Sequence, residues 1–83
     1  MNFLKIIEKV NSQALYPTGY KSAIIGMAER NGVCVLVLSE LKCIRILKET
    51  MTEDEAHEYF EYNISGSYNG PNSPVYVQDR WET

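Results

Sequence analysis

The sequence predicts a single α+β domain in which an antiparallel hairpin and a third strand pack with an N-terminal helix and a helical hairpin. Apolar residues recur at helical spacing near the N-terminus, and two runs rich in Val and Ile flank Asn31-Gly32. Residues 52–55 match a helix-capping sequence. A chain of 83 residues is shorter than those that usually divide, so we expect residues 1–83 to form one domain.

The first expected element is a helix over residues 2–14. Its apolar residues repeat at intervals of three and four, the period of an amphipathic helix. Pro17 and Gly19 follow it closely and favour a turn that ends the helix.

Two strands are expected next, over residues 22–29 and 33–39. Asn31-Gly32 between them is a strong signal for a tight hairpin, so the strands should be antiparallel. Gly26 in the first strand indicates a bulge or a close approach of another backbone.

The second strand is apolar on both faces, because Val33, Val35 and Val37 alternate with Cys34, Leu36 and Leu38. Both faces should therefore be covered. A chain this short has few elements to cover them, so we expect a second copy on one face and a homodimer or larger assembly.

Two helices and a third strand complete the predicted fold. Ser39 can cap a helix that extends to about Glu49, and Thr52 and Glu55 can form a capping box that begins the next helix. Its inner face should hold Ala56, Tyr59, Phe60 and either Asn63 or Ile64. Gly66 is expected to end it in a left-handed conformation. Turn-forming residues 69–74 then lead to a strand over residues 75–78, and residues 79–83 are expected to be a loose tail.

Composition excludes several classes of protein. A net charge of -3 disfavours nucleic-acid binding, which normally needs clustered Lys and Arg. Lys5, Glu8 and Lys9 interrupt the region where a signal peptide would be apolar, and no run is long enough to cross a bilayer. We therefore expect a cytoplasmic protein with no membrane contact. Cys34 and Cys43 are interpreted as buried small apolar residues.

The sequence contains no pattern that predicts catalysis. It lacks a phosphate loop, a dinucleotide-binding fingerprint, a nucleophile elbow and a metal-binding helix motif. Its single histidine, His57, has no neighbour that would make it a general base or metal ligand, and we interpret it as solvated. We expect no enzyme activity, no catalytic residue, no metal and no cofactor.

Five residues are candidates for a ligand-binding pocket. Tyr59 and Asn63 lie one helical turn apart, Tyr68 follows the helix end, and Arg30 and Lys42 are the cations that could hold an anion. An Asn on an apolar helix face would be buried and need a hydrogen-bond partner. It either ties the Gly66 loop to the helix or lines the pocket.

An acidic strip is the candidate surface for a protein partner. Asp54, Glu58 and Glu61 recur at intervals of four and three, on one outer face of the third helix. They form either a solvated face or a docking strip for a basic partner.

A series of segments between residues 16 and 75 carries a family resemblance. They are Tyr16-Pro17-Thr18-Gly19, Ile25-Gly26 with Arg30, Lys42-Cys43-Ile44 with Ile46-Leu47, Met51-Thr52 through Glu55-Ala56, Glu58-Tyr59-Phe60-Glu61-Tyr62-Asn63, and Gly66 with Tyr68 and Gly70. The series resembles a family of short uncharacterised proteins of bacteriophages and of bacteria that carry phage-derived genes. The resemblance implies a non-enzymatic accessory protein that binds and modulates a host protein, such as a counter-defence factor. The alternative is an oligomeric binder of a small anionic ligand such as a nucleotide.

Overall fold

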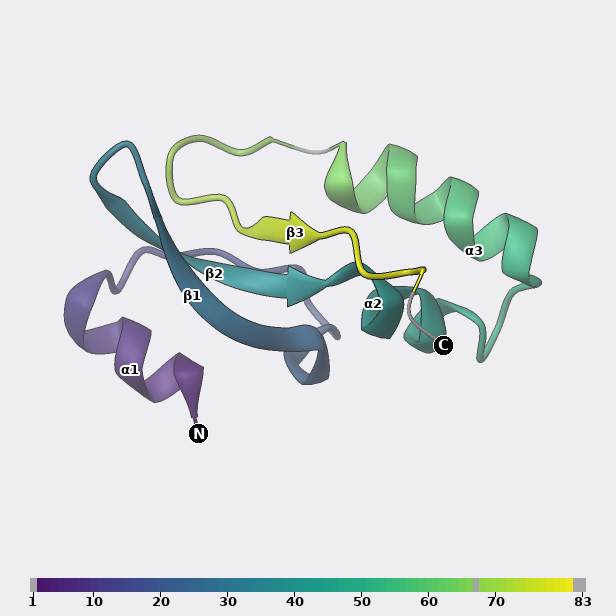
Figure 1. Cartoon of the computed structure of the whole chain (residues 1–83), viewed down its shortest axis with the longest axis horizontal. Helices are drawn as coiled ribbons and strands as arrows, with labels where there is room; N and C mark the ends of the chain where they lie inside the picture. The colour runs from purple at the N-terminus through teal and green to yellow at the C-terminus, as the bar shows by residue number, and fades with distance from the viewer. Residues whose placement is uncertain (1, 67, 82–83) are drawn as a thin grey trace.

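A computed structural model describes residues 2–66 and 68–81 of the chain (Figure 1). Its elements, in chain order, are α1 (Phe3–Val10), the 3₁₀ turn η1 (Lys21–Ala23), β1 (Ile24–Arg30), β2 (Val33–Ser39), α2 (Glu40–Leu47), α3 (Glu53–Tyr59), the π-helical turn η2 (Phe60–Ser65) and β3 (Val75–Val77). The predicted α+β fold is confirmed, with η1 as an addition that the sequence patterns did not predict.

Helix α1 is shorter than predicted because Asn11 leaves the helix. The Asn11 amide donates hydrogen bonds to the carbonyl oxygen of Cys34 (2.8 Å) and to Oδ1 of Asn72 (2.9 Å). Its own Oδ1 accepts from the Gln13 N–H (3.2 Å), so the side chain forms a local turn. The helix therefore ends at Val10, and the chain is tied to β2 and to the loop before β3.

The three strands form one sheet in the order β1-β2-β3 (Figure 1). Strands β1 and β2 are antiparallel, and Asn31 and Gly32 in their turn have φ angles of 54° and 80°, as a two-residue hairpin requires. The register shifts between Ile24 and Gly26, which confirms the predicted bulge. Strand β3 runs parallel to β2, with Val75 beside Val37.

The core lies on one face of the sheet. Leu36 and Leu38 of β2 pack there with Ile7, Ile44 and Phe60, which come from three different helical elements. Cys43 belongs to the same cluster and is fully buried, whereas Cys34 is half-buried, so the predicted burial of both cysteines holds for Cys43 alone.

The opposite face of β2 carries Val33, Val35 and Val37, which do not belong to the core cluster. Arg30, which pairs with Val33 across the hairpin, reaches over β2 to the carbonyl oxygen of Ser73. Its side chain thus crosses the face on which Val35 is fully buried. The predicted second copy on this face, and with it the homodimer, stays a prediction.

Both predicted helix starts after β2 are confirmed. Ser39 caps α2, because its hydroxyl accepts from the Lys42 N–H (3.1 Å). Thr52 and Glu55 form the capping box of α3: the Thr52 N–H donates to Glu55 Oε1 (3.0 Å), and the Glu55 N–H donates to Thr52 Oγ1 (3.2 Å).

The end of the third helix differs from the prediction. Gly66 has φ -78° and ψ -7°, so the expected left-handed cap is wrong. The helix widens into η2 instead, and the Gly66 N–H donates to the carbonyl oxygen of Glu61 (3.0 Å). A Cβ atom at Gly66 would lie 2.5 Å from that oxygen. Glycine is needed here for a close approach.

The π-helical turn η2 also supplies part of the inner face of this helix. Ala56, Phe60 and Ile64 are buried, and the Phe60 ring meets the Tyr76 ring edge-on at 5.5 Å between centres. Asn63 is exposed and Tyr59 is 41% exposed, so the expected inner position is wrong for Tyr59, and of the two alternatives it is Ile64 that faces inward.

The C-terminal segment is held where a loose tail was expected. The Asp79 carboxylate accepts hydrogen bonds from the Leu41 N–H (2.8 Å) and the Ser39 hydroxyl (2.5 Å) at the start of α2. Burial opposes ionisation of Asp79, but these bonds outweigh it and lower its pKa. Arg80 lies near Glu40 and Glu61, and residues 82–83 of the expected tail fall outside the described part of the chain.

Candidate functional site

The five predicted pocket residues lie in three separate places. Tyr59 and Asn63 line one depression, on the outer side of α3 and η2. Arg30 and Tyr68 line a groove beside β3. Lys42 lies on α2 in a third depression. The structure therefore does not bring them together as one site.

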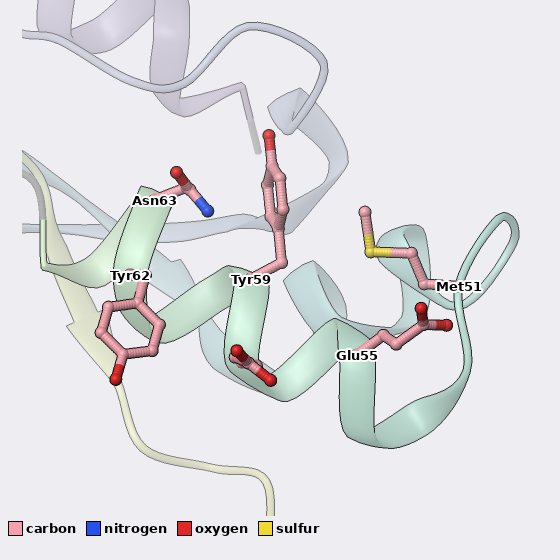
Figure 2. Close-up of a pocket in the computed structure, with 6 residues that line it drawn as sticks. Met51, Glu55, Tyr59, Tyr62 and Asn63 are labelled. Atoms are coloured by element: carbon pink, nitrogen blue, oxygen red, sulfur yellow. The ribbon is translucent and has the colours of Figure 1, made fainter.

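The first depression has a volume of about 340 Å³ and extends from the start of α3 to η2. Figure 2 shows Tyr59 and Asn63 side by side on one side of the helix, with Tyr62 projecting away from them. The six residues that line it are Met51, Glu55, Glu58, Tyr59, Tyr62 and Asn63.

Asn63 was expected to be buried and to need a partner. It is exposed, and among the described residues its side chain makes no hydrogen bond to the Gly66 loop. Backbone contacts hold that loop, since the Gly66 N–H bonds to Glu61. The structural role considered for Asn63 has no support from these contacts, and its role in a pocket stays a prediction.

The depression is electronegative. Of the described residues that line it, Glu55 and Glu58 carry charge and none is a cation. The hydrogen bond from the Thr52 N–H, together with the Thr52 hydroxyl, lowers the pKa of Glu55, so this carboxylate is ionised at neutral pH. Such a lining repels anions and favours a cationic or neutral group.

The predicted acidic strip is present as an exposed surface. Asp54, Glu58 and Glu61 are all exposed along α3 and η2. Glu61 Oε1 lies 3.7 Å from Nη1 of Arg80, whereas Asp54 and Glu58 form no ion pair with a described residue. Asp54 and Glu58 therefore carry negative charge that no described residue neutralises in an ion pair.

Exposed aromatic side chains accompany this charge. Tyr59 and Tyr62 are 41% and 76% exposed, and they lie directly among the glutamates of the same helix. Met51, Glu55 and Tyr62 also line the depression and were not expected from the sequence to be site residues. The spacing from Glu58 to Tyr62 is one helical turn, and this signal could have placed Tyr62 on the outer face.

Arg30 and Tyr68 are close to each other, but they lie in the groove beside β3 and not with Tyr59 and Asn63. The Arg30 guanidinium lies 5.7 Å from the centre of the Tyr68 ring. Its Nη2 donates to the carbonyl oxygens of Ser73 (2.8 Å) and Pro71 (3.2 Å). Arg30 therefore holds the loop before β3 through Nη2.

Lys42 lies apart from the depression at Tyr59 and from the groove at Arg30. It shares its depression with Arg45, Ser22 and Glu49, on the side of α2 that faces solvent.

Among residues 2–66 and 68–81, no three His, Cys, Asp or Glu side chains are grouped as metal ligands would be. None of the helices described is long and apolar enough to cross a membrane.

Comparison with models of protein families, with curated proteins and with solved structures finds no match to this chain. The resemblance to short bacteriophage proteins stays a prediction.

Proposed function

We propose that this chain is a non-enzymatic binding domain that docks a protein partner on its α3–η2 face. This face is the exposed surface formed by Asp54, Glu55, Glu58, Tyr59 and Tyr62. The observation that carries the proposal is the placement of two exposed tyrosines among carboxylates that form no ion pair with a described residue.

Exposed tyrosines suit a protein interface for a physical reason. A Tyr side chain offers a large amphipathic surface and loses little conformational entropy when it is fixed, so tyrosines are frequent among the residues that dominate binding energy. Tyr62 has 76% of its surface exposed and gains little from the core of its own chain. A partner can bury most of this area.

The charge of the face defines the chemistry of the partner. Asp54, Glu55 and Glu58 give the face a negative potential, which attracts a partner with Lys or Arg around an apolar patch. Such complementarity raises the association rate more than the final affinity, and salt weakens it.

The alternative of a small anionic ligand has less support. The depression at Tyr59 and Asn63 contains two glutamates, and the two candidate cations lie elsewhere. A nucleotide phosphate there would meet like charge. The resemblance to phage accessory proteins makes a host protein the partner in this proposal, with the chain acting in the host cytoplasm as a modulator such as a counter-defence factor.

Site-specific photocrosslinking tests the proposal. A photoreactive phenylalanine replaces Tyr62 in one protein and, as a control, Val10 on α1, which is also exposed. In host cells we expect a discrete protein adduct from position 62 that disappears when Glu58→Gln and Tyr59→Ala are added. Equal adducts from position 10, or an adduct at position 62 that both substitutions leave unchanged, would contradict the proposal.

A further inference from the structure

A second groove, the β3 groove, lies between the free edge of the sheet and η2. It has a volume of about 530 Å³, and its lining includes Glu40, Phe60, Ser65, Val75, Tyr76 and Gln78. In the strand order β1-β2-β3, β3 is an edge strand (Figure 1). The β3 groove therefore runs along a sheet edge that a further strand could extend.

The outer edge of β3 offers backbone groups to such a strand. In a paired edge strand, alternate N–H and C=O groups point away from the sheet. Among the described residues, the bond from the Asp79 N–H to the Val77 carbonyl oxygen (3.0 Å) is the one backbone hydrogen bond that β3 makes beyond its ladder with β2.

Glu40 supplies a buried charge in the same groove. Its side chain is 8% exposed, and Oε1 accepts no hydrogen bond from the described residues. Because Ser39 pairs with Val77, Glu40 follows at the C-terminal end of β3. Buried carboxylates are normally hydrogen-bonded, so this oxygen calls for a donor.

The nearest cation satisfies Glu40 incompletely. Arg80 Nε lies 3.6 Å from Glu40 Oε1, while Nη1 of the same guanidinium lies 3.7 Å from Glu61 Oε1. Both separations exceed hydrogen-bond length, and the guanidinium also stacks on the exposed Trp81 ring. Arg80 thus balances the charge of Glu40 without donating a hydrogen bond to Oε1.

The length of the groove sets the size of an occupant. Arg30 closes one end through its bond to Ser73, and Glu40 marks the other end beside Val77. At a rise of about 3.3 Å per residue, this stretch accommodates roughly four residues in extended conformation.

We propose that the β3 groove binds an extended segment of a protein partner, which lies beside β3 as a fourth strand and places an Arg or Lys side chain on Glu40. Backbone bonds to β3 supply affinity, and Glu40 supplies specificity for the cation. This groove is separate from the α3–η2 face, so the two sites can be tested independently.

A library of short random peptides tests this proposal on the intact chain. Peptides selected on the wild-type protein should share an Arg or Lys at one position between apolar residues. In fluorescence polarisation, Glu40→Gln should weaken the best peptide about tenfold or more, because its cation loses a charged acceptor. Arg80→Gln should tighten binding, since it removes the competing guanidinium. Tyr62→Ala, on the α3–η2 face, should leave it unchanged.

A second variant guards against a folding defect in Glu40→Gln. Gln78 is exposed and lines the groove, so Gln78→Lys should keep the fold, as circular dichroism can verify, and still weaken the peptide by competing for Glu40. Selected peptides without a shared cation, or with full affinity for folded Glu40→Gln and Gln78→Lys, would overturn the proposal.

Two other outcomes would also overturn it. Peptides that lose affinity in Tyr62→Ala but not in Glu40→Gln would occupy the α3–η2 face, and the proposed function would stand without this groove. If no peptide is selected and light scattering shows a dimer that Gln78→Lys dissociates, the occupant is β3 of a second copy.

Discussion

Arg30 donates a hydrogen bond from Nη2 to the carbonyl oxygen of Ser73 at 2.8 Å, and this bond joins the end of β1 to the segment that leads into β3. Ser73 is itself buried, and its hydroxyl accepts from the Asn69 N–H (2.8 Å). The contact thus fixes the loop before the edge strand. It assigns a structural role to a residue that the sequence suggested as an anion ligand.

We expect Arg30→Ala to lower the free energy of unfolding by about 1.5 to 3 kcal/mol, the range for hydrogen bonds that involve a charged group. Arg30→Lys should recover only part of this loss, because the shorter side chain lacks the planar guanidinium whose Nη2 reaches both carbonyl oxygens. Urea denaturation measures both. Lys42→Ala is the matched control, and a loss there equal to that of Arg30→Ala would contradict the structural role.

Gly66→Ala should destabilise the protein by about 1 to 3 kcal/mol, as overpacking does, because the new Cβ atom would lie 2.5 Å from the Glu61 carbonyl oxygen. Gly26→Ala is the control, since no atom lies within 4 Å of its Cβ position. It should remain within about 0.5 kcal/mol of wild type. Thermal unfolding of both variants tests the difference, and a well-tolerated Gly66→Ala would refute the π-helical end of the helix.

The Asp79 carboxylate predicts a loss of stability in acid. Hydrogen bonds from Leu41 and Ser39 outweigh the effect of burial and lower its pKa in the folded state, so its contribution is present above the unfolded pKa of about 3.9. That contribution disappears as the pH falls through the lower, folded pKa. Asp79→Asn should be less stable than wild type at pH 7, and the difference should narrow as the pH falls toward 2. A difference that is independent of pH would be the contrary result.

The two cysteines should differ in reactivity. Burial, followed by the nearby charges of Asp79 and Glu40, raises the pKa of Cys43 to about 12, so its thiolate is scarce at neutral pH. Cys43 is also fully buried, whereas Cys34 is half-buried. In a Cys34→Ser variant, iodoacetamide should modify Cys43 at pH 8 only when denaturant is added. Rapid labelling of the native variant would show that the core is open at this position.

Local signals in the sequence were sufficient for several elements. The hairpin at Asn31-Gly32 and the capping box of Thr52 and Glu55 depend on residues within one turn of each other, and both are present. The end of α1 could not be predicted in this way. It depends on Asn11, whose partners Cys34 and Asn72 are 23 and 61 positions away.

In the candidate site, too, features that depend on nearby residues were predictable and those that depend on distant contacts were not. Asp54, Glu58 and Glu61 are each exposed, as expected for the outer side of the predicted helix. Arg30 was separated from Tyr59 by the fold, because its guanidinium is directed over β2 to Ser73. Glu40 had no signal in the sequence, since its burial depends on β3 and the C-terminal segment packing beside α2.

The most direct test of the α3–η2 face is the affinity of the crosslinked partner for Tyr62→Ala, measured by calorimetry beside His57→Ala on the same helix. We predict that Tyr62→Ala keeps the thermal stability of the wild type and loses about tenfold or more in affinity, as a central interface tyrosine does, while His57→Ala binds like wild type. Full affinity in a folded Tyr62→Ala protein would contradict the account.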